Sequence, residues 1–129
     1  LSDFAKTPPA KHIPLAQPQG TDQHTHELAL TLRAYRLQLI AANIANADTP
    51  GYKAVDIDID EALRNRHFRI SDIPLIYPAP RQISLDGNTV ELDTERAKFA
   101  ETAVMYQFSL QRAIGHYKHM MEMFQMLKD

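Results

Sequence analysis

The chain has no cysteine, no tryptophan and only four glycines among its 129 residues. Without cysteine it forms no disulfide, no thiolate metal site and no cysteine nucleophile. No stretch reaches the 18 or so apolar residues of a membrane-spanning helix, and no charged-then-apolar signal peptide opens the sequence. A net charge of −2 with scattered basic residues gives no electrostatic reason to expect a nucleic-acid partner.

The signatures of catalysis are also missing. The sequence contains no glycine-rich phosphate loop and no Gly-x-Ser-x-Gly elbow for a nucleophilic serine. His116, His119 and Glu122 recur at steps of three, a spacing that suits a metal, but the His-Glu-x-x-His pattern of zinc enzymes is absent. We therefore expect a protein that is not an enzyme and that binds no cofactor, metal or small-molecule substrate.

The first 23 residues hold half of the prolines and show no helical or strand period. This composition predicts a flexible, Pro-rich arm over residues 1–23. The remaining residues, 24–129, are enough for a single domain. Within it we predict an N-terminal helix over 24–48, a middle region over 49–92 and a C-terminal helix over 93–128.

Apolar residues recur at steps of three and four through the predicted N-terminal helix, which is the spacing of a heptad seam. The seam consists of Leu28, Leu32, Tyr35 and Leu39. A second apolar line on another face consists of Leu30, Leu37, Ile40 and Ile44. An ordinary core helix explains one such face, so the second favours packing in a larger bundle or between subunits.

The end of this helix is marked by a polar and proline-containing stretch. Thr49 precedes a proline and is biased away from helical angles, and Pro50-Gly51 suits the centre of a type II turn. Two asparagine amides are placed to bond carbonyls of the last helical turn or a neighbouring chain. The predicted junction site consists of Asn43, Asn46, Thr49, Pro50, Gly51 and Tyr52.

The middle region carries strand-like patterns. Apolar and acidic residues alternate across 55–60, which predicts an extended segment with one apolar face and one solvated acidic face. The aspartate spacing also suggests a calcium loop, but Glu61 and His67 stand where an EF-hand needs glycine and glutamate. Asp86-Gly87, between 83–85 and 88–92, predicts a β-hairpin.

The last segment has the strongest pattern. Asp93 or Thr94 suits its N-cap, and apolar residues then recur every three or four positions through more than three heptads. The predicted seam includes Tyr106, Leu110, Tyr117, Met120 and Phe124. The sequence thus predicts a mainly α fold, in which two long terminal helices pack as a coiled-coil-like pair around a small extended or β-hairpin middle region.

Several stretches resemble a known family. The run Asn43-Ile44-Ala45-Asn46, followed by Thr49-Pro50-Gly51-Tyr52, is similar to the signature of the bacterial flagellar rod and hook family of axial proteins. Tyr52–Asp58, Ser84–Val90 and Glu95–Ala100 follow in the family's order. The resemblance runs from about Glu27 to the C-terminus. Residues 1–23 depart from the family's usual start, so no role is carried over to them.

The resemblance implies a structural subunit of the proximal rod of the flagellar basal body, which self-assembles and transmits motor torque to the hook. It implies a periplasmic location and export through the flagellar type III apparatus without a cleaved signal peptide. The implied partners are copies of the chain, other rod proteins, and the membrane-ring and adaptor proteins at the rod base. Alternatives are another rod or hook protein, a helical export chaperone or adaptor of fixed size, and an enzyme such as a cell-wall hydrolase.

Overall fold

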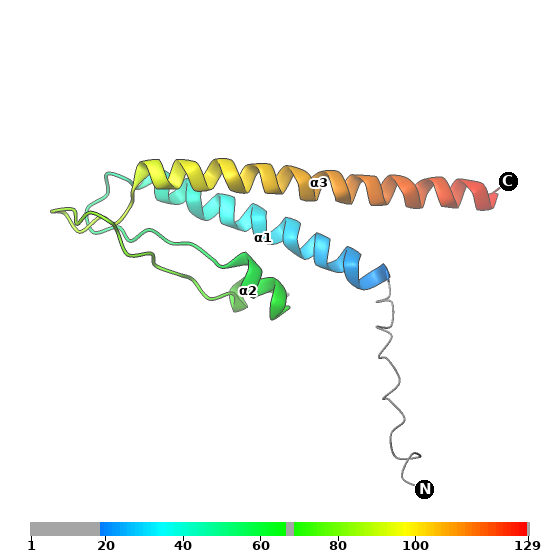
Figure 1. Cartoon of the computed structure of the whole chain (residues 1–129), viewed down its shortest axis with the longest axis horizontal. Coiled ribbons are helices and arrows are strands. Elements are labelled where there is room, and N and C mark those ends of the chain that lie inside the picture. Colours follow the sequence, from blue (N-terminus) through cyan, green and yellow to red (C-terminus); the bar gives the residue numbers. More distant parts are fainter. Residues whose placement is uncertain (1–18, 67–68, 129) are drawn as a thin grey trace, which may run out of the picture.

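Two long helices lie side by side and give the molecule an elongated shape (Figure 1). The computed structural model describes residues 19–66 and 69–128, with side chains from residue 24 onward. Helix α1 (Gln19–Ala45) runs antiparallel to helix α3 (Leu92–Lys128). With 27 and 37 residues, the two helices are about 40 and 55 Å long. The prediction of a mainly α protein with a long C-terminal helix is confirmed.

The observed helix ends differ a little from the predicted ones. Helix α1 begins at Gln19, inside the stretch predicted to be an arm, and ends at Ala45. Residues 1–18, the rest of that stretch, lie outside the described residues. Helix α3 begins at Leu92, a residue that we had assigned to the second strand of the hairpin.

Two short helices interrupt the middle region, and the sequence patterns predicted neither. Helix α2 (Ile59–Arg64) starts where the extended segment was expected to continue, because the Asp58 carboxylate accepts a hydrogen bond from the N–H of Glu61 and caps it. A 3-10 turn, η2, follows at Ile70–Asp72. The chain then returns antiparallel to its outgoing path, with one two-way backbone bridge between Asp56 and Ile76.

The predicted β-hairpin is wrong, since residues 83–92 are all described and none of them lies in a strand. The Asp86-Gly87 turn does form, with a hydrogen bond from the N–H of Gly87 to the Ser84 carbonyl and a φ of +77° at Gly87. The segment after the turn pairs elsewhere, however. Gly51 donates its N–H to the Asp86 carbonyl, and Thr89 donates to the Tyr52 carbonyl. Backbone groups of Asp86 and Thr89 therefore bond to the turn at the end of α1 and not to each other's segments, as they would in a hairpin.

The apolar core lies between α1, α2 and the segment that follows α2. Its buried members are Leu32, Ile57, Ala62 and Ile73, and its partly buried members are Leu28, Tyr35, Leu39, Ile59 and Leu63. The first apolar seam of α1 therefore packs against the middle region of the same chain. Neither α1 nor α3, nor the short helix α2, has the length and apolar character needed to cross a membrane.

Candidate functional site

Asn43 is the centre of the helix-to-turn junction and is only 1% exposed. Its amide group donates to the Val55 carbonyl at 2.8 Å and to the Glu95 carboxylate at 3.0 Å. Its oxygen accepts from the Val55 N–H at 3.0 Å and from the Tyr52 hydroxyl at 3.1 Å. Both donors and both acceptor positions are used, so this one side chain joins α1, the middle region and α3.

The other predicted junction residues form the turn that leaves α1. The Asn46 amide donates to the Ala42 carbonyl and accepts from the Thr49 hydroxyl, which ends the helix. The Tyr52 N–H bonds to the Thr49 carbonyl at 3.2 Å, and Gly51 has a φ of +73°. This backbone suits the predicted Pro-Gly turn, and Pro50 itself is exposed at its tip.

Asn88 completes the junction, although the sequence analysis had not selected it as a site residue. Its amide nitrogen lies 2.8 to 3.0 Å from three carbonyl oxygens, those of Asn46, Ala47 and Thr49. Its side-chain oxygen accepts from the Val90 N–H at 2.7 Å. These carbonyls follow the helix and have no partner within it, so Asn88 serves as a C-terminal cap supplied from a distant part of the chain.

Asp56 is buried against both long helices, so the predicted solvated acidic face is wrong at this residue, whereas Asp58 and Asp60 are exposed. The Arg36 guanidinium binds its carboxylate through two nitrogens, at 2.8 and 3.0 Å, and the Lys98 ammonium lies 3.4 Å away. Burial by itself would raise the pKa of Asp56. Hydrogen bonds from Arg36 and the Ile57 N–H, with the charges of Arg36 and Lys98, outweigh burial and lower that pKa below its usual value. The hydrogen bond to Asp56 in turn raises the pKa of Arg36.

The contact between α1 and α3 includes a row of polar side chains. Glu95, Thr102 and Ser109 recur at every seventh position of α3 and are all buried. Each meets a polar side chain of α1, namely Asn43, Arg36 and Arg33 respectively. The three α3 residues have heptad spacing, but they are polar, and they are not the apolar seam that the sequence predicted for a coiled-coil-like pair.

The apolar residues predicted to form an assembly seam lie in two different environments. On α1, Leu32 is buried in the core, and Leu28, Tyr35 and Leu39 pack against it. On α3, Tyr106 and Leu110 are half-buried, whereas Tyr117, Met120 and Phe124 are exposed. The role of this set in assembly remains a prediction, and its exposed members are Tyr117, Met120 and Phe124.

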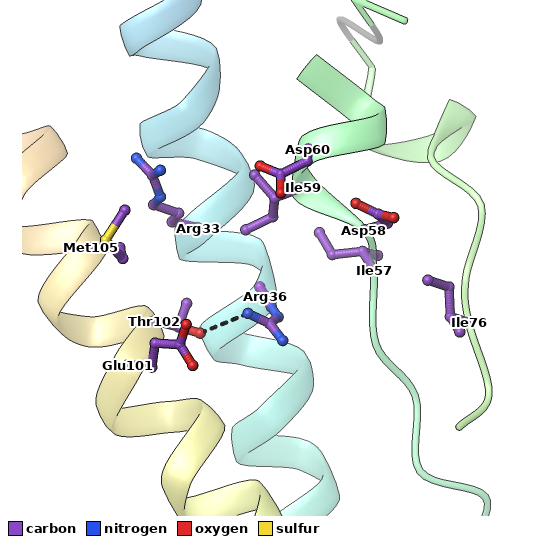
Figure 2. A pocket seen from close by; sticks show the side chains of 10 residues that line it. All are labelled: Arg33, Arg36, Ile57, Asp58, Ile59, Asp60, Ile76, Glu101, Thr102 and Met105. Carbon is purple, nitrogen blue, oxygen red and sulfur yellow. Dashed lines mark hydrogen bonds between the residues drawn. The ribbon is translucent and has the colours of Figure 1, made fainter. Parts of the chain in front are cut away.

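A cleft of about 440 Å³ opens between α1, α3 and the start of α2 (Figure 2). It is lined by Arg33, Arg36, Ile57, Asp58, Ile59, Asp60, Ile76, Glu101, Thr102 and Met105. Figure 2 shows the Arg36 guanidinium pointing to Thr102, whose hydroxyl accepts a hydrogen bond from it. This charged group of the cleft is therefore already engaged within the chain. Among the described residues, no group of three or more histidine, aspartate or glutamate side chains gathers in a way that could hold a metal ion.

These features define a class: an elongated helical protein, closed by hydrogen bonds at one end and exposing apolar helix surface at the other. Comparison with known proteins identifies the family within this class. The family model "Flagella basal body rod protein" matches residues 24–53, which comprise most of α1 and the junction.

Curated relatives cover about three quarters of the chain. The flagellar basal body rod protein FlgB of Escherichia coli K12 is 43% identical over 121 residues, covering 75% of this chain and 88% of the relative. FlgB of Proteus mirabilis is 37% identical over 126 residues, with coverages of 79% and 92%. FlgB of Buchnera aphidicola is 34% identical over 117 residues, with coverages of 74% and 88%. The chain belongs to the FlgB family of flagellar basal body rod proteins.

Proposed function

We propose that this chain is a structural subunit of the proximal rod of the bacterial flagellar basal body. In this role it packs with copies of itself and with other rod proteins, and it transmits motor torque towards the hook. The observation that carries the proposal is its 43% identity to a flagellar basal body rod protein, over 88% of that protein's length. No feature of the described residues favours the export-chaperone or adaptor alternative.

The geometry supports a mechanical role. The end where α1 meets α3 is held by directional hydrogen bonds on Asn43, Asn88 and Asp56, which fix the middle region against both helices. The far half of α3 presents apolar side chains to solvent. In the rod, this exposed face would pack with helices of neighbouring subunits in a coiled-coil-like manner and hide its apolar surface.

The location and partners follow from the same proposal. The subunit lies in the periplasmic part of the basal body and reaches it through the flagellar type III export apparatus, without a cleaved signal peptide. At the base of the rod it contacts the membrane-ring and adaptor proteins. The exposed part of the predicted seam, Tyr117, Met120 and Phe124, is the surface that we assign to contacts with neighbouring rod subunits.

A complementation experiment tests the proposal. The chain is expressed in an Escherichia coli strain that lacks its own FlgB, and swimming in soft agar is measured with the content of purified basal bodies. We expect the chain in basal bodies and swimming restored. Leu110→Asp or Tyr117→Asp should abolish both, because a charge on this face opposes burial against another helix. Gln111→Asp, at an exposed neighbouring position, is the matched control.

Each result separates the parts of the proposal. Normal motility of the Leu110 and Tyr117 variants, at normal protein levels, would contradict the assignment of the seam. A wild-type chain that is produced and exported but is absent from basal bodies would contradict the rod proposal itself. Sedimentation velocity with far-UV circular dichroism adds a check on the purified protein, since open-ended growth separates a rod subunit from a dimer of fixed size.

A further inference from the structure

The cleft between α1, α3 and the start of α2 combines exposed apolar side chains with carboxylates that lack partners. On its apolar walls, which also include Ile57 and Ile59, Ile76 is 42% exposed and Met105 is 43% exposed. Asp60 and Glu101 line the cleft from α2 and α3 (Figure 2), and both are exposed. Neither carboxylate forms a hydrogen bond or an ion pair with any residue that the structure describes. Such a surface suits an occupant that brings both a cation and an aliphatic side chain.

The cleft has more carboxylates than cations around it. The charged side chains that line it, or that belong to the ion pairs of Arg36, are Arg33, Arg36 and Lys98 against Asp56, Asp58, Asp60, Glu95 and Glu101. Arg36 is bound by Asp56, and Arg33 donates to the Ser109 hydroxyl. The Asp58 carboxylate caps α2. A cation that enters the cleft therefore meets a negative surround and two carboxylates that are open to it.

A segment of the same chain, outside the described residues, has the complementary chemistry. Residues 11–15 read Lys-His-Ile-Pro-Leu. Ile13 precedes a proline and is therefore biased towards an extended backbone, which reduces the conformational entropy that docking costs. In an extended backbone alternate residues share one side, so a single face of this segment presents one cation and two aliphatic side chains, those of Lys11, Ile13 and Leu15.

The length of chain before α1 lets this segment reach the cleft. Helix α1 begins at Gln19, and the cleft residues Arg33 and Arg36 lie about 21 and 26 Å further along its axis. An extended chain that doubles back from Gln19 covers about 3.3 Å per residue, which carries Ile13 about 20 Å and Lys11 about 26 Å along the same path. Both side chains therefore reach the level of α1 at which the cleft opens.

We propose that residues 11–15 dock in the cleft of their own chain. In this arrangement the Lys11 ammonium lies at the carboxylates of Asp60 and Glu101, and the Ile13 side chain packs against Met105. Docking removes apolar surface from water and gives the two carboxylates a cation. It also closes the cleft of a free subunit to other chains. The inference goes beyond the proposed rod function and does not depend on it.

The absence of cysteine allows a direct test, because two introduced thiols form one defined pair. The full-length Ile13→Cys/Met105→Cys protein is oxidised at a dilution at which sedimentation shows monomers. The disulfide within one chain is then followed by gel mobility and mass spectrometry. Ile13→Cys/Gln107→Cys is the matched control, since position 107 is also exposed and lies at nearly the same level of α3, but on the opposite side of the helix.

We expect the 13–105 disulfide to form at least about tenfold faster than the 13–107 disulfide, because docking raises the effective concentration of the arm thiol at one face of α3 only. Adding Lys11→Glu should slow the 13–105 disulfide by about fivefold, through the loss of a modest ion pair. Lys6→Glu makes the same change of charge outside residues 11–15 and should leave the rate unaltered. Far-UV circular dichroism checks that every variant keeps its helices.

Equal rates for the 13–105 and 13–107 pairs would overturn the proposal, as would equal effects of Lys11→Glu and Lys6→Glu. Single-cysteine Ile13→Cys and Met105→Cys proteins are also mixed and oxidised. A 13–105 disulfide that forms only between two molecules would assign the cleft to the segment of a second copy and would likewise overturn the proposal. None of these measurements involves basal bodies, so the failure of this contact and the failure of the rod function are distinguished.

Discussion

The two ends of the molecule differ in which side chains they bury and which they expose. At the junction, buried polar groups such as the Asn43 amide, the Glu95 carboxylate and the Asn88 amide are each matched by named partners. Along the last third of α3, apolar side chains such as Met121 and Phe124 are left in water. Polar groups are buried where the elements of the chain are held together, and apolar groups are exposed on the surface that we propose for contact with other subunits.

The contrast separates two kinds of substitution. A buried hydrogen-bonded group is costly to remove because its partners remain buried without a replacement. An exposed apolar side chain costs the monomer almost nothing to remove, because it contributes little to folding. Changes at the junction should therefore act on folding, and changes at exposed apolar residues in the last third of α3 should act on assembly.

The largest effect is expected from Asn43→Asp, with a loss of about 3 kcal/mol in the free energy of unfolding. The change removes both amide donors and places a second carboxylate against Glu95, whose oxygen lies 3.0 Å from the Asn43 nitrogen. Urea unfolding measures it. Adding Glu95→Gln should recover at least half of the loss, because a glutamine amide can donate to the new carboxylate. Gln107→Glu is the surface control, and an unchanged midpoint for Asn43→Asp would contradict the central role of Asn43.

A smaller, pH-dependent effect is expected at Asp56. Its pKa in the folded protein lies below the ordinary 3.8, so its contribution to stability is present above that value and lost as the pH falls through the folded pKa. Asp56→Asn should cost about 2 kcal/mol at pH 7, by leaving the Arg36 charge without its partner.

The check is the unfolding midpoint between pH 7 and pH 2. The wild type should lose stability below about pH 4, and the gap between wild type and Asp56→Asn should narrow there. A gap that stays constant down to pH 2 would show that the charge of Asp56 is not what stabilises the fold.

A change in the opposite direction is expected at Gly115, which interrupts the exposed half of α3. Alanine is the better helix former by up to about 1 kcal/mol, and a β-carbon built at this position meets no atom within 4 Å. Gly115→Ala should therefore raise the unfolding midpoint. A lower midpoint would mean that this half of α3 requires flexibility or a close contact at Gly115.

The smallest effect on folding is expected from Phe124→Ser in the exposed last third of α3. The free energy of unfolding should change by less than about 0.5 kcal/mol, whereas sedimentation should show weaker assembly at the same concentration. A large loss of monomer stability would remove the contrast between the two ends, because it would place Phe124 in the folding core.

The parts of the fold that could be predicted are those that depend on residues close together in the sequence. Apolar steps of three and four indicated two long helices, and Thr49-Pro50-Gly51 indicated where the first one stops. Helix α2 was missed because its six residues are too few for a period to emerge. The hairpin was predicted from Asp86-Gly87, which does form a turn. A turn sequence does not indicate, however, which segment will hydrogen-bond to the backbone groups on either side of it.

The candidate site was predictable only in part, because its chemistry joins residues far apart in the sequence. Asn43 and Tyr52 were selected together and do meet. Asp56 was placed on a solvated face by alternation, yet Arg36 and Lys98 come from two other elements to bury it. The seam of Glu95, Thr102 and Ser109 has the period of an interhelical contact without its usual composition. Counting apolar residues alone conceals such a seam.

That polar seam also has a consequence for the thermodynamics of heating. Exposing apolar surface raises the heat capacity of an unfolding protein, whereas exposing polar surface lowers it. The α1–α3 contact holds a carboxylate, two hydroxyls, an amide and two guanidinium groups, so its opening adds little heat capacity. The stability curve of the isolated subunit should therefore be flatter than that of a variant with an apolar α1–α3 contact, with weaker destabilisation on cooling.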